Sequence, residues 1–220
     1  MSVDLKLSTK TKRAAGQRCC APFVYPDVDR EQAIRVAEVA KALGGSGGVG
    51  MPLADHHTIR PATAADLPAV LEIYNAGIAE RVATFETDPR SESDLAGWTT
   101  DSQPFIVATQ AGRVVGFARA GSYSNRYVYQ GIGEHAVYVH PTARSQGLGR
   151  RLLSALCDES ERRGLYKLTS RIFTDNHPSR AAHHAAGFKE VGIQRRHGRL
   201  EGQWKDCVLV ERLLGQAAIT

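Results

Sequence analysis

The chain has 220 residues, of which 42% are hydrophobic and 23% charged, so it can bury a core of ordinary size. Its formal net charge of +5 suits anionic small molecules but is too thin over this length for a nucleic-acid binder. No stretch approaches the roughly 20 apolar residues of a membrane span, and the basic N-terminus lacks the apolar segment of a signal peptide. These features predict a soluble cytoplasmic protein that binds neither nucleic acid nor membrane.

Residues 1–56 are predicted to form an N-terminal appendage. Apolar residues recur at helical spacing between Asp29 and Leu43, and five glycines fall within the seven residues from Gly44 to Gly50. Because one short helix cannot bury its apolar face alone, we expect a short helix followed by a flexible glycine-rich linker.

Residues 57–220 are predicted to form one α/β domain of the α+β type. Apolar runs bounded by turn residues predict seven strands, at 58–61, 105–109, 114–120, 135–139, 165–173, 188–193 and 207–213. Helical spacing and capping residues predict four helices, at 63–78, 91–98, 147–163 and 178–186. Three strands in succession without a crossover helix favour a mixed sheet over a doubly wound one.

The most informative segment joins the fourth predicted strand to the third predicted helix. The strand ends at Val139, a loop rich in small residues follows, and Gly147 and Gly149 stand at the helix start. Glycines let backbone N–H groups converge on an anion, and Arg144 and Arg150 add positive charge beside the helix N-terminus. The segment therefore predicts a phosphate site, although Gly-x-Gly at a helix start is also compatible with plain tight packing.

Arg144-x-x-Gly147-x-Gly149 after an apolar strand resembles the acyl-CoA pyrophosphate motif of the GNAT N-acetyltransferase superfamily, whose element order this chain matches. Asn176 with Ala186-Gly187-Phe188 resembles the next motif of that superfamily. The resemblance implies the GNAT fold, a mixed and largely antiparallel sheet with flanking helices, and acetyl-CoA as cosubstrate. It assigns nine residues to the cofactor: Val137, Val139, Arg144, Gln146, Gly147, Leu148, Gly149, Arg150 and Asn176.

Other segments resemble one branch of the superfamily, the phosphinothricin N-acetyltransferases. They are Ile73–Ile78 with Thr84–Pro89, Ala120–Tyr123 with Arg126 and Tyr129, Glu134–Val139, and the closing Gly198…Gly202-x-Trp204-x-Asp206. The resemblance implies acetylation of the α-amine of a toxic glutamate analogue, phosphinothricin or its arsenic counterpart arsinothricin, which confers resistance. Methionine sulfoximine or sulfone is the alternative substrate, and a homodimer is expected because family members are commonly dimers.

The same resemblance implies roles for individual residues. Glu134 is expected to be the general base, because an α-ammonium must lose a proton before it attacks; an ordinary strand-end carboxylate is the alternative. His183 is expected to protonate the CoA sulfur or to assist the base, with packing near the cofactor as the alternative. The Val139 N–H is expected to polarise the acetyl carbonyl. Arg126 would pair with an anionic group of the substrate, while Phe85 and Tyr129 would shape the pocket. Ser124 stands where some members carry Lys, so binding of the substrate's anionic group is expected to differ from that in those members.

The four cysteines fall into two groups. Cys19 and Cys20, with the helical segment that follows, resemble the opening of some arsenical-responsive repressors, which implies an arsenic-resistance setting. A binding module that senses an arsenical through these two thiols is therefore a rival interpretation. Cys157 and Cys207 fall at apolar positions and are predicted to be core thiols. No group of ligands has metal-binding spacing, so no metal is predicted.

Overall fold

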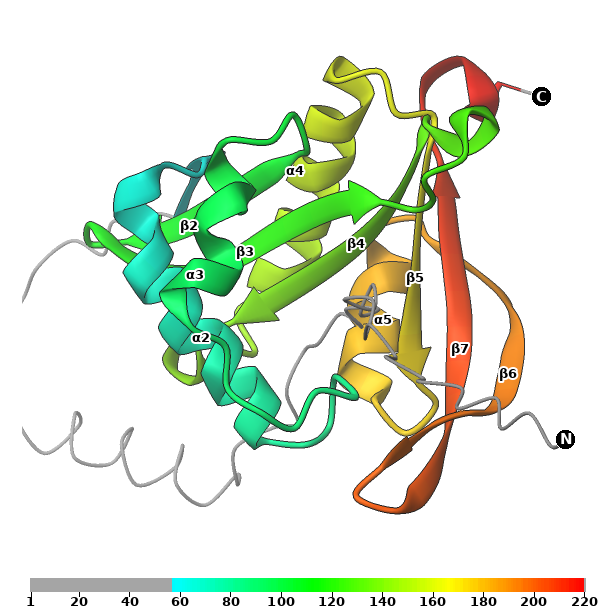
Figure 1. The fold of residues 1–220 in the computed structure, drawn as a ribbon. Helices are drawn as coiled ribbons and strands as arrows, with labels where there is room; N and C mark the ends of the chain where they lie inside the picture. The colour runs from blue at the N-terminus through cyan, green and yellow to red at the C-terminus, as the bar shows by residue number, and fades with distance from the viewer. Residues whose placement is uncertain (1–56, 220) are drawn as a thin grey trace, which may run out of the picture.

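The computed structural model describes residues 57–219, which form a single sheet with helices on both of its faces (Figure 1). The strands are β1 (His57–Pro61), β2 (Phe105–Gln110), β3 (Arg113–Ser122), β4 (Ile132–Val139), β5 (Lys167–Phe173), β6 (Lys189–Leu200) and β7 (Gln203–Leu213). The helices are α2 (Leu67–Ala79), α3 (Glu92–Leu95), α4 (Leu148–Arg162) and α5 (His177–Ala185). This order confirms the predicted one. The expected appendage of residues 1–56, with Cys19 and Cys20, lies outside the described residues.

The seven strands follow the order β1-β2-β3-β4-β5-β7-β6, and all neighbours are antiparallel except β4 and β5. The mixed, largely antiparallel sheet is therefore confirmed. The parallel pair β4–β5 is joined through α4, since parallel neighbours need a crossover. It spans only three positions and ends where Glu134 lies opposite Thr169. Beyond that point the strands diverge, and Figure 1 shows β3 and β4 running obliquely to β5 and β7.

Two apolar cores lie on opposite faces of this sheet. Helices α2 and α3 cover one face, where Tyr74 packs against Phe117 and Tyr138, and α4 and α5 cover the other (Figure 1). Four residues of α4 predicted to point inward are buried there: Leu148, Leu152, Leu156 and Cys157. No helix in residues 57–219 is long and apolar enough to cross a membrane.

The largest departure from the predicted boundaries is the β6–β7 hairpin. β6 continues to Leu200, although the strand was predicted to end at Ile193, and β7 begins at Gln203. Except for the buried Leu200, the residues added to β6 are polar or glycine and mostly exposed, so they show none of the apolar alternation by which a strand is recognised. Backbone pairing with β7, two register shifts included, holds them in the sheet.

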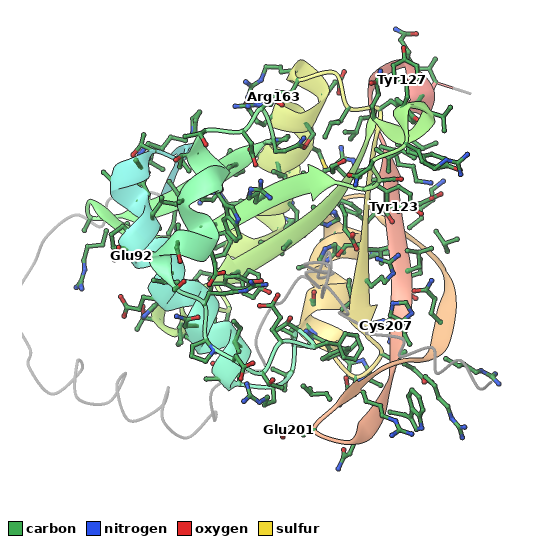
Figure 2. All side chains as sticks on the ribbon, viewed as in Figure 1. Glu92, Tyr123, Tyr127, Arg163, Glu201 and Cys207 are labelled. Carbon is green, nitrogen blue, oxygen red and sulfur yellow. The ribbon has the colours of Figure 1, made fainter. Side chains whose placement is uncertain are left out.

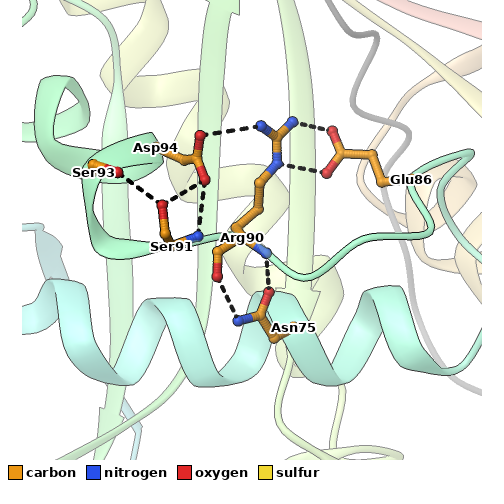
Figure 3. Close-up of polar contacts among 6 residues, drawn as sticks. All are labelled: Asn75, Glu86, Arg90, Ser91, Ser93 and Asp94. Atoms are coloured by element: carbon orange, nitrogen blue, oxygen red, sulfur yellow. Dashed lines mark hydrogen bonds and ion pairs between the residues drawn. The ribbon is translucent and has the colours of Figure 1, made fainter.

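The connection between α2 and α3 is fixed by Arg90 (Figure 3). Its backbone N–H donates to Asn75 Oδ1 at 2.7 Å, and its carbonyl accepts from Asn75 Nδ2 at 3.0 Å. Its guanidinium forms ion pairs with Glu86 and Asp94. Arg90 thus ties the connection to α2 through its backbone and to α3 through its guanidinium, and this connection carries Phe85 to the far end of β5.

Candidate active site

Glu134 lies at the last paired position between β4 and β5, where the two strands begin to diverge. Its carboxylate forms an ion pair with Arg171 of β5, and the Arg171 Nε donates to Gln194 Oε1 of β6 at 3.2 Å. The side chains of Glu134 and Arg171 are only 17% and 18% exposed. A charge-assisted bond in such surroundings holds the Glu134 carboxylate in a defined position.

An open cavity of about 130 Å³ adjoins Glu134 on the α2 side of the sheet. Its lining includes four aromatic and two charged side chains: Tyr74, Trp98, Phe117, Tyr138, Arg119 and Glu134. The aromatic rings contact one another: Phe117 stacks on Tyr138 with 5.2 Å between the ring centroids. A mainly apolar wall with a few charges suits a small molecule that carries polar groups on an apolar body. We call this space the Glu134 cavity.

The backbone of β4 presents free donors toward the divergence. His140 N–H donates to Val115 O of β3 at 2.8 Å, and in an antiparallel ladder alternate residues bond to the same neighbour. Tyr138 therefore bonds to β3, whereas the N–H groups of Val137 and Val139 point toward β5. The parallel pairing with β5 ends before these residues. Val137 and Val139 thus lie where a ligand chain can pair with the strand.

The N-terminus of α4 offers a second group of donors. Gly147 is the N-cap with φ 73°, and no side chain caps the helix. The first N–H groups of an α-helix have no partner within the helix, which leaves those of Leu148, Gly149 and Arg150 available to an anion. Arg150 is exposed beside them, and the nearby Gln146 Nε2 donates to a loop carbonyl.

Arg144 and Asn176, both predicted to hold the cofactor, are engaged within the fold. Arg144 donates to Glu80 Oε1 at 3.0 Å and to Val139 O at 3.3 Å. Burial lowers the pKa of the Arg144 guanidinium to about 10, so it stays cationic at neutral pH. Asn176 Oδ1 accepts from Ser179 N–H at 3.1 Å and so caps α5. Arg144 thus bonds to residues at the ends of α2 and β4, and Asn176 bonds at the start of α5. Contact of either side chain with a cofactor stays a prediction.

His183 is fully buried on α5 and faces His135 of β4, with 3.1 Å between the two Nε2 atoms. Its Nδ1 lies 2.7 Å from Ser179 O, a contact that requires a proton on Nδ1. Burial lowers the pKa of His183 to about 4, so the ring is neutral at pH 7 and its Nε2 carries no proton. A neutral ring without a proton on Nε2 has none to donate to a thiolate from that atom, and a catalytic role of His183 stays a prediction.

Phe85 packs at the far end of β5 rather than in the Glu134 cavity. Its ring lies 4.9 Å from that of Phe173, edge to face. A Cβ placed at Gly198 of β6 would approach the Phe85 ring to 2.7 Å, so only glycine leaves room for it. Phe85 thus packs the α2–α3 connection against the β6–β7 hairpin.

The other two residues predicted to bind substrate lie in the connection from β3 to β4. Arg126 is exposed, with its guanidinium 5.3 Å from the centre of the Tyr129 ring. Neither side chain lines the Glu134 cavity. Figure 2 shows Tyr127 of this connection near the C-terminal end of β7, whereas Glu201 lies at the opposite end of the β6–β7 hairpin. The structure therefore does not bring Arg126 and Tyr129 together with Glu134.

Two residues at the site were not predicted from the sequence, Arg119 and Arg171. Each interrupts a run of buried residues on its strand, with Ala118 and Ala120 on either side of Arg119. A charged residue within an apolar strand was the available signal, because such a position must face either water or a partner.

Comparison with known proteins agrees with this architecture. Residues 70–188, more than half of the chain, match the Acetyltransferase (GNAT) family. A Salmonella typhimurium protein named L-methionine sulfoximine/L-methionine sulfone acetyltransferase is 32% identical over 165 residues, covering 73% of this chain and 96% of that protein. Phosphinothricin N-acetyltransferase from Streptomyces viridochromogenes is 34% identical, covering 70% of this chain and 86% of the relative.

The fold is shared with solved acetyltransferases. A phosphinothricin acetyltransferase of the GNAT superfamily from Sinorhizobium meliloti, solved in complex with AcCoA, matches with a TM-score of 0.70 and 34% identity. The match covers 75% of this chain and 92% of that one. Sequence, strand order and the β4–β5 divergence thus lead to one conclusion: the chain belongs to the GNAT family of acetyltransferases.

Proposed function

We propose that this protein transfers the acetyl group of acetyl-CoA to the α-amine of a glutamate-like amino acid, with phosphinothricin or arsinothricin as the leading substrate. The observation that carries the proposal is the position of Glu134, fixed by Arg171 in an aromatic cavity where β4 and β5 diverge. The names of the relatives support an amino acid as the acyl acceptor.

The described residues fit acetyl-CoA, which supplies an activated acetyl thioester. Val137 and Val139 present N–H groups toward the divergence of β4 and β5, where they can pair with an extended amide chain. The uncapped start of α4 at Gly147, with Arg150 exposed beside it, suits a polyphosphate. The cofactor therefore binds along the end of β4 and the start of α4, and the amine of the substrate lies in the Glu134 cavity.

Within this arrangement Glu134 accepts a proton from the substrate's α-ammonium, which frees the nitrogen lone pair for attack. The Val139 N–H polarises the acetyl carbonyl. Transfer is direct, because neither cysteine of the described residues is placed as a nucleophile. Cys157 and Cys207 are both buried, and burial raises the pKa of the Cys157 thiol to about 11.

The proposal is tested by CoA release from acetyl-CoA with phosphinothricin, arsinothricin, methionine sulfoximine, methionine sulfone and glutamate as acceptors. We expect turnover with the first two and a fall in kcat of about 10²- to 10⁴-fold for Glu134→Gln, the usual range for loss of a general base. Glu190→Gln is the matched control, since Glu190 is also paired with an arginine but lies on β6. Acetyl-CoA binding, measured by calorimetry, should persist in both variants.

Absence of turnover with every acceptor, in a protein that still binds acetyl-CoA, would contradict the substrate class. Turnover of only the sulfoximine and sulfone would favour the alternative substrates, which the name of the Salmonella relative supports. The rival role of Cys19 and Cys20 is tested separately by titration with arsenite. Activity and free-thiol count that arsenite leaves unchanged would dismiss an arsenical-binding module.

A further inference from the structure

Arg119 shares a wall of the Glu134 cavity with Glu134 itself. It lies in the middle of β3 opposite Ala136, and Gly121 of the same strand lies opposite Glu134. Because side chains on a strand alternate between faces, Arg119 and Glu134 project from the same face of the sheet. Both line the cavity, Arg119 from β3 and Glu134 from β4.

The guanidinium of Arg119 contacts two neighbouring side chains, and one of its N–H groups has no acceptor among residues 57–219. It forms an ion pair with Asp101, and its centre lies 5.0 Å from the centre of the Trp98 ring. The side chain is 17% exposed, and its Nε is buried with no hydrogen-bond partner among residues 57–219. Asp101 is the one carboxylate paired with Arg119 among residues 57–219, so an acceptor on a ligand in the cavity would give the part of the guanidinium that lines it a second partner.

The neighbourhood leaves space for such an acceptor. Gly121, two positions along β3, has no side chain, and a Cβ built there would approach Arg119 Nη1 to 3.3 Å. Apart from Glu134, the remaining lining residues are aromatic or small, and none of them carries a positive charge. The lining thus carries one guanidinium and one carboxylate, which come from neighbouring strands.

We propose that Arg119 binds the anionic group on the side chain of the amino-acid substrate whose α-amine lies at Glu134. The inference rests on the proposed function and specifies its substrate class as an amino acid that carries a second anion, such as a phosphinate or arsinate. A guanidinium fixed by Asp101 and Trp98 is suited to an oxyanion, because its N–H groups form a rigid planar array. Arg126, which was expected to perform this task, is exposed on the β3–β4 connection and lies outside the cavity.

The test compares two acceptors of similar size, phosphinothricin with an anionic side chain and methionine sulfone with a neutral one. For Arg119→Gln we expect KM for phosphinothricin to rise about 10- to 100-fold, the effect of losing a hydrogen-bonded ion pair. KM for methionine sulfone should change less than about threefold, since a neutral sulfone depends less on the charge. Arg119→Lys should fall between wild type and Arg119→Gln with phosphinothricin. Arg113→Gln, on the same strand but exposed, should match wild type.

Calorimetric binding of acetyl-CoA shows whether each variant is folded. If Arg119→Gln is unstable because Asp101 is left unpaired, the double variant Arg119→Gln/Asp101→Asn removes that charge and serves the same comparison. Equal changes of KM for both acceptors, or none, would overturn the inference while wild-type turnover upholds the proposed function. A selective rise of KM in Arg126→Gln instead of Arg119→Gln would overturn it in favour of the loop arginine. Wild-type protein that acetylates neither acceptor would contradict the proposed function itself.

Discussion

The surroundings of each residue at this site depend on the face of the sheet from which its side chain projects. Glu134 and Arg171 come from neighbouring strands and form an ion pair that is largely shielded from water. His135 follows Glu134 directly but projects from the other face, where it meets His183. Adjacent residues of one strand therefore belong to two different environments, a polar cavity and a buried pair of imidazoles.

The buried histidines make a prediction about stability and pH. The pKa of His183 is lowered from 6.5 to about 4, and that of His135 is also lowered, in both cases chiefly because burial disfavours the imidazolium. Above about pH 6.5 folded and unfolded chains both hold these rings neutral. As the pH falls toward about 4, only the unfolded chain takes up protons, so the free energy of unfolding decreases. We expect a loss of about 1–3 kcal/mol from His183 alone, at 1.36 kcal/mol per unit of pKa difference.

Urea unfolding at a series of pH values between neutrality and pH 4.5 measures this effect. His183→Gln removes the titrating group and should flatten the dependence on pH. His184→Gln is the matched control, because His184 is the next residue of α5 but is exposed. A slope for His183→Gln that equals the wild-type slope would show that the burial of His183 does not govern acid stability.

Among the secondary-structure elements, α4 connects the fold to the site. Its apolar face is buried against the sheet, and its N-terminus begins at Gly147 beside the end of β4. Ser145 and Gly147 both have positive φ, so the chain turns sharply before the helix. The N-cap Gly147 has no side chain that could accept a bond from the first N–H groups of α4, which leaves these groups available to a ligand.

Gly147→Ala tests the importance of that turn. At φ 73° an alanine costs about 1 kcal/mol of stability from backbone strain, and no atom lies within 4 Å of the added Cβ. We also expect KM for acetyl-CoA to rise several-fold as the N–H groups shift. Gly112→Ala is the control, with φ 77° and equally open surroundings in the β2–β3 turn. Gly112→Ala should lose similar stability in thermal unfolding and keep the wild-type KM for acetyl-CoA. A rise of KM in both variants would show that the effect does not depend on the N-terminus of α4.

At the scale of the whole molecule, the sheet ends in an exposed edge. β6 is the last strand of the order, and apolar side chains on β6 and β7 remain in water, with Ile193 61% and Trp204 50% exposed. Exposed edge strands with apolar side chains are prone to pair with another chain. The homodimer expected from the family resemblance stays a prediction, and this edge is where it is best tested.

We expect sedimentation to find a dimer that Ile193→Lys converts to monomer, because a buried lysine opposes association. Val128→Lys is the matched control: Val128 is 63% exposed but lies in the β3–β4 connection, away from β6. A monomer at all concentrations for the unaltered chain would contradict the expected dimer. A dimer that only Val128→Lys disrupts would place the contact on the β3–β4 connection.

The sequence by itself determined the order of the elements, the mixed sheet, the buried face of α4 and the position of Glu134 on β4. These features follow from local periodicity, capping residues and glycine positions, which are properties of neighbouring residues. The polar extension of β6 to Leu200 escaped prediction, because its pairing is made by the backbone and leaves no apolar pattern.

Only the tertiary structure decided which charged groups meet. Arg119, Glu134 and Arg171 come from β3, β4 and β5, and sheet register alone places them on one face. The β3–β4 connection leaves Arg126 outside the cavity, and packing of α5 on the sheet encloses His183 with His135. Contacts between residues far apart in the chain depend on strand order and twist, which no local pattern encodes. The sequence therefore specified the fold and the strand that bears Glu134, while packing of the strands selected the charged partners of Glu134.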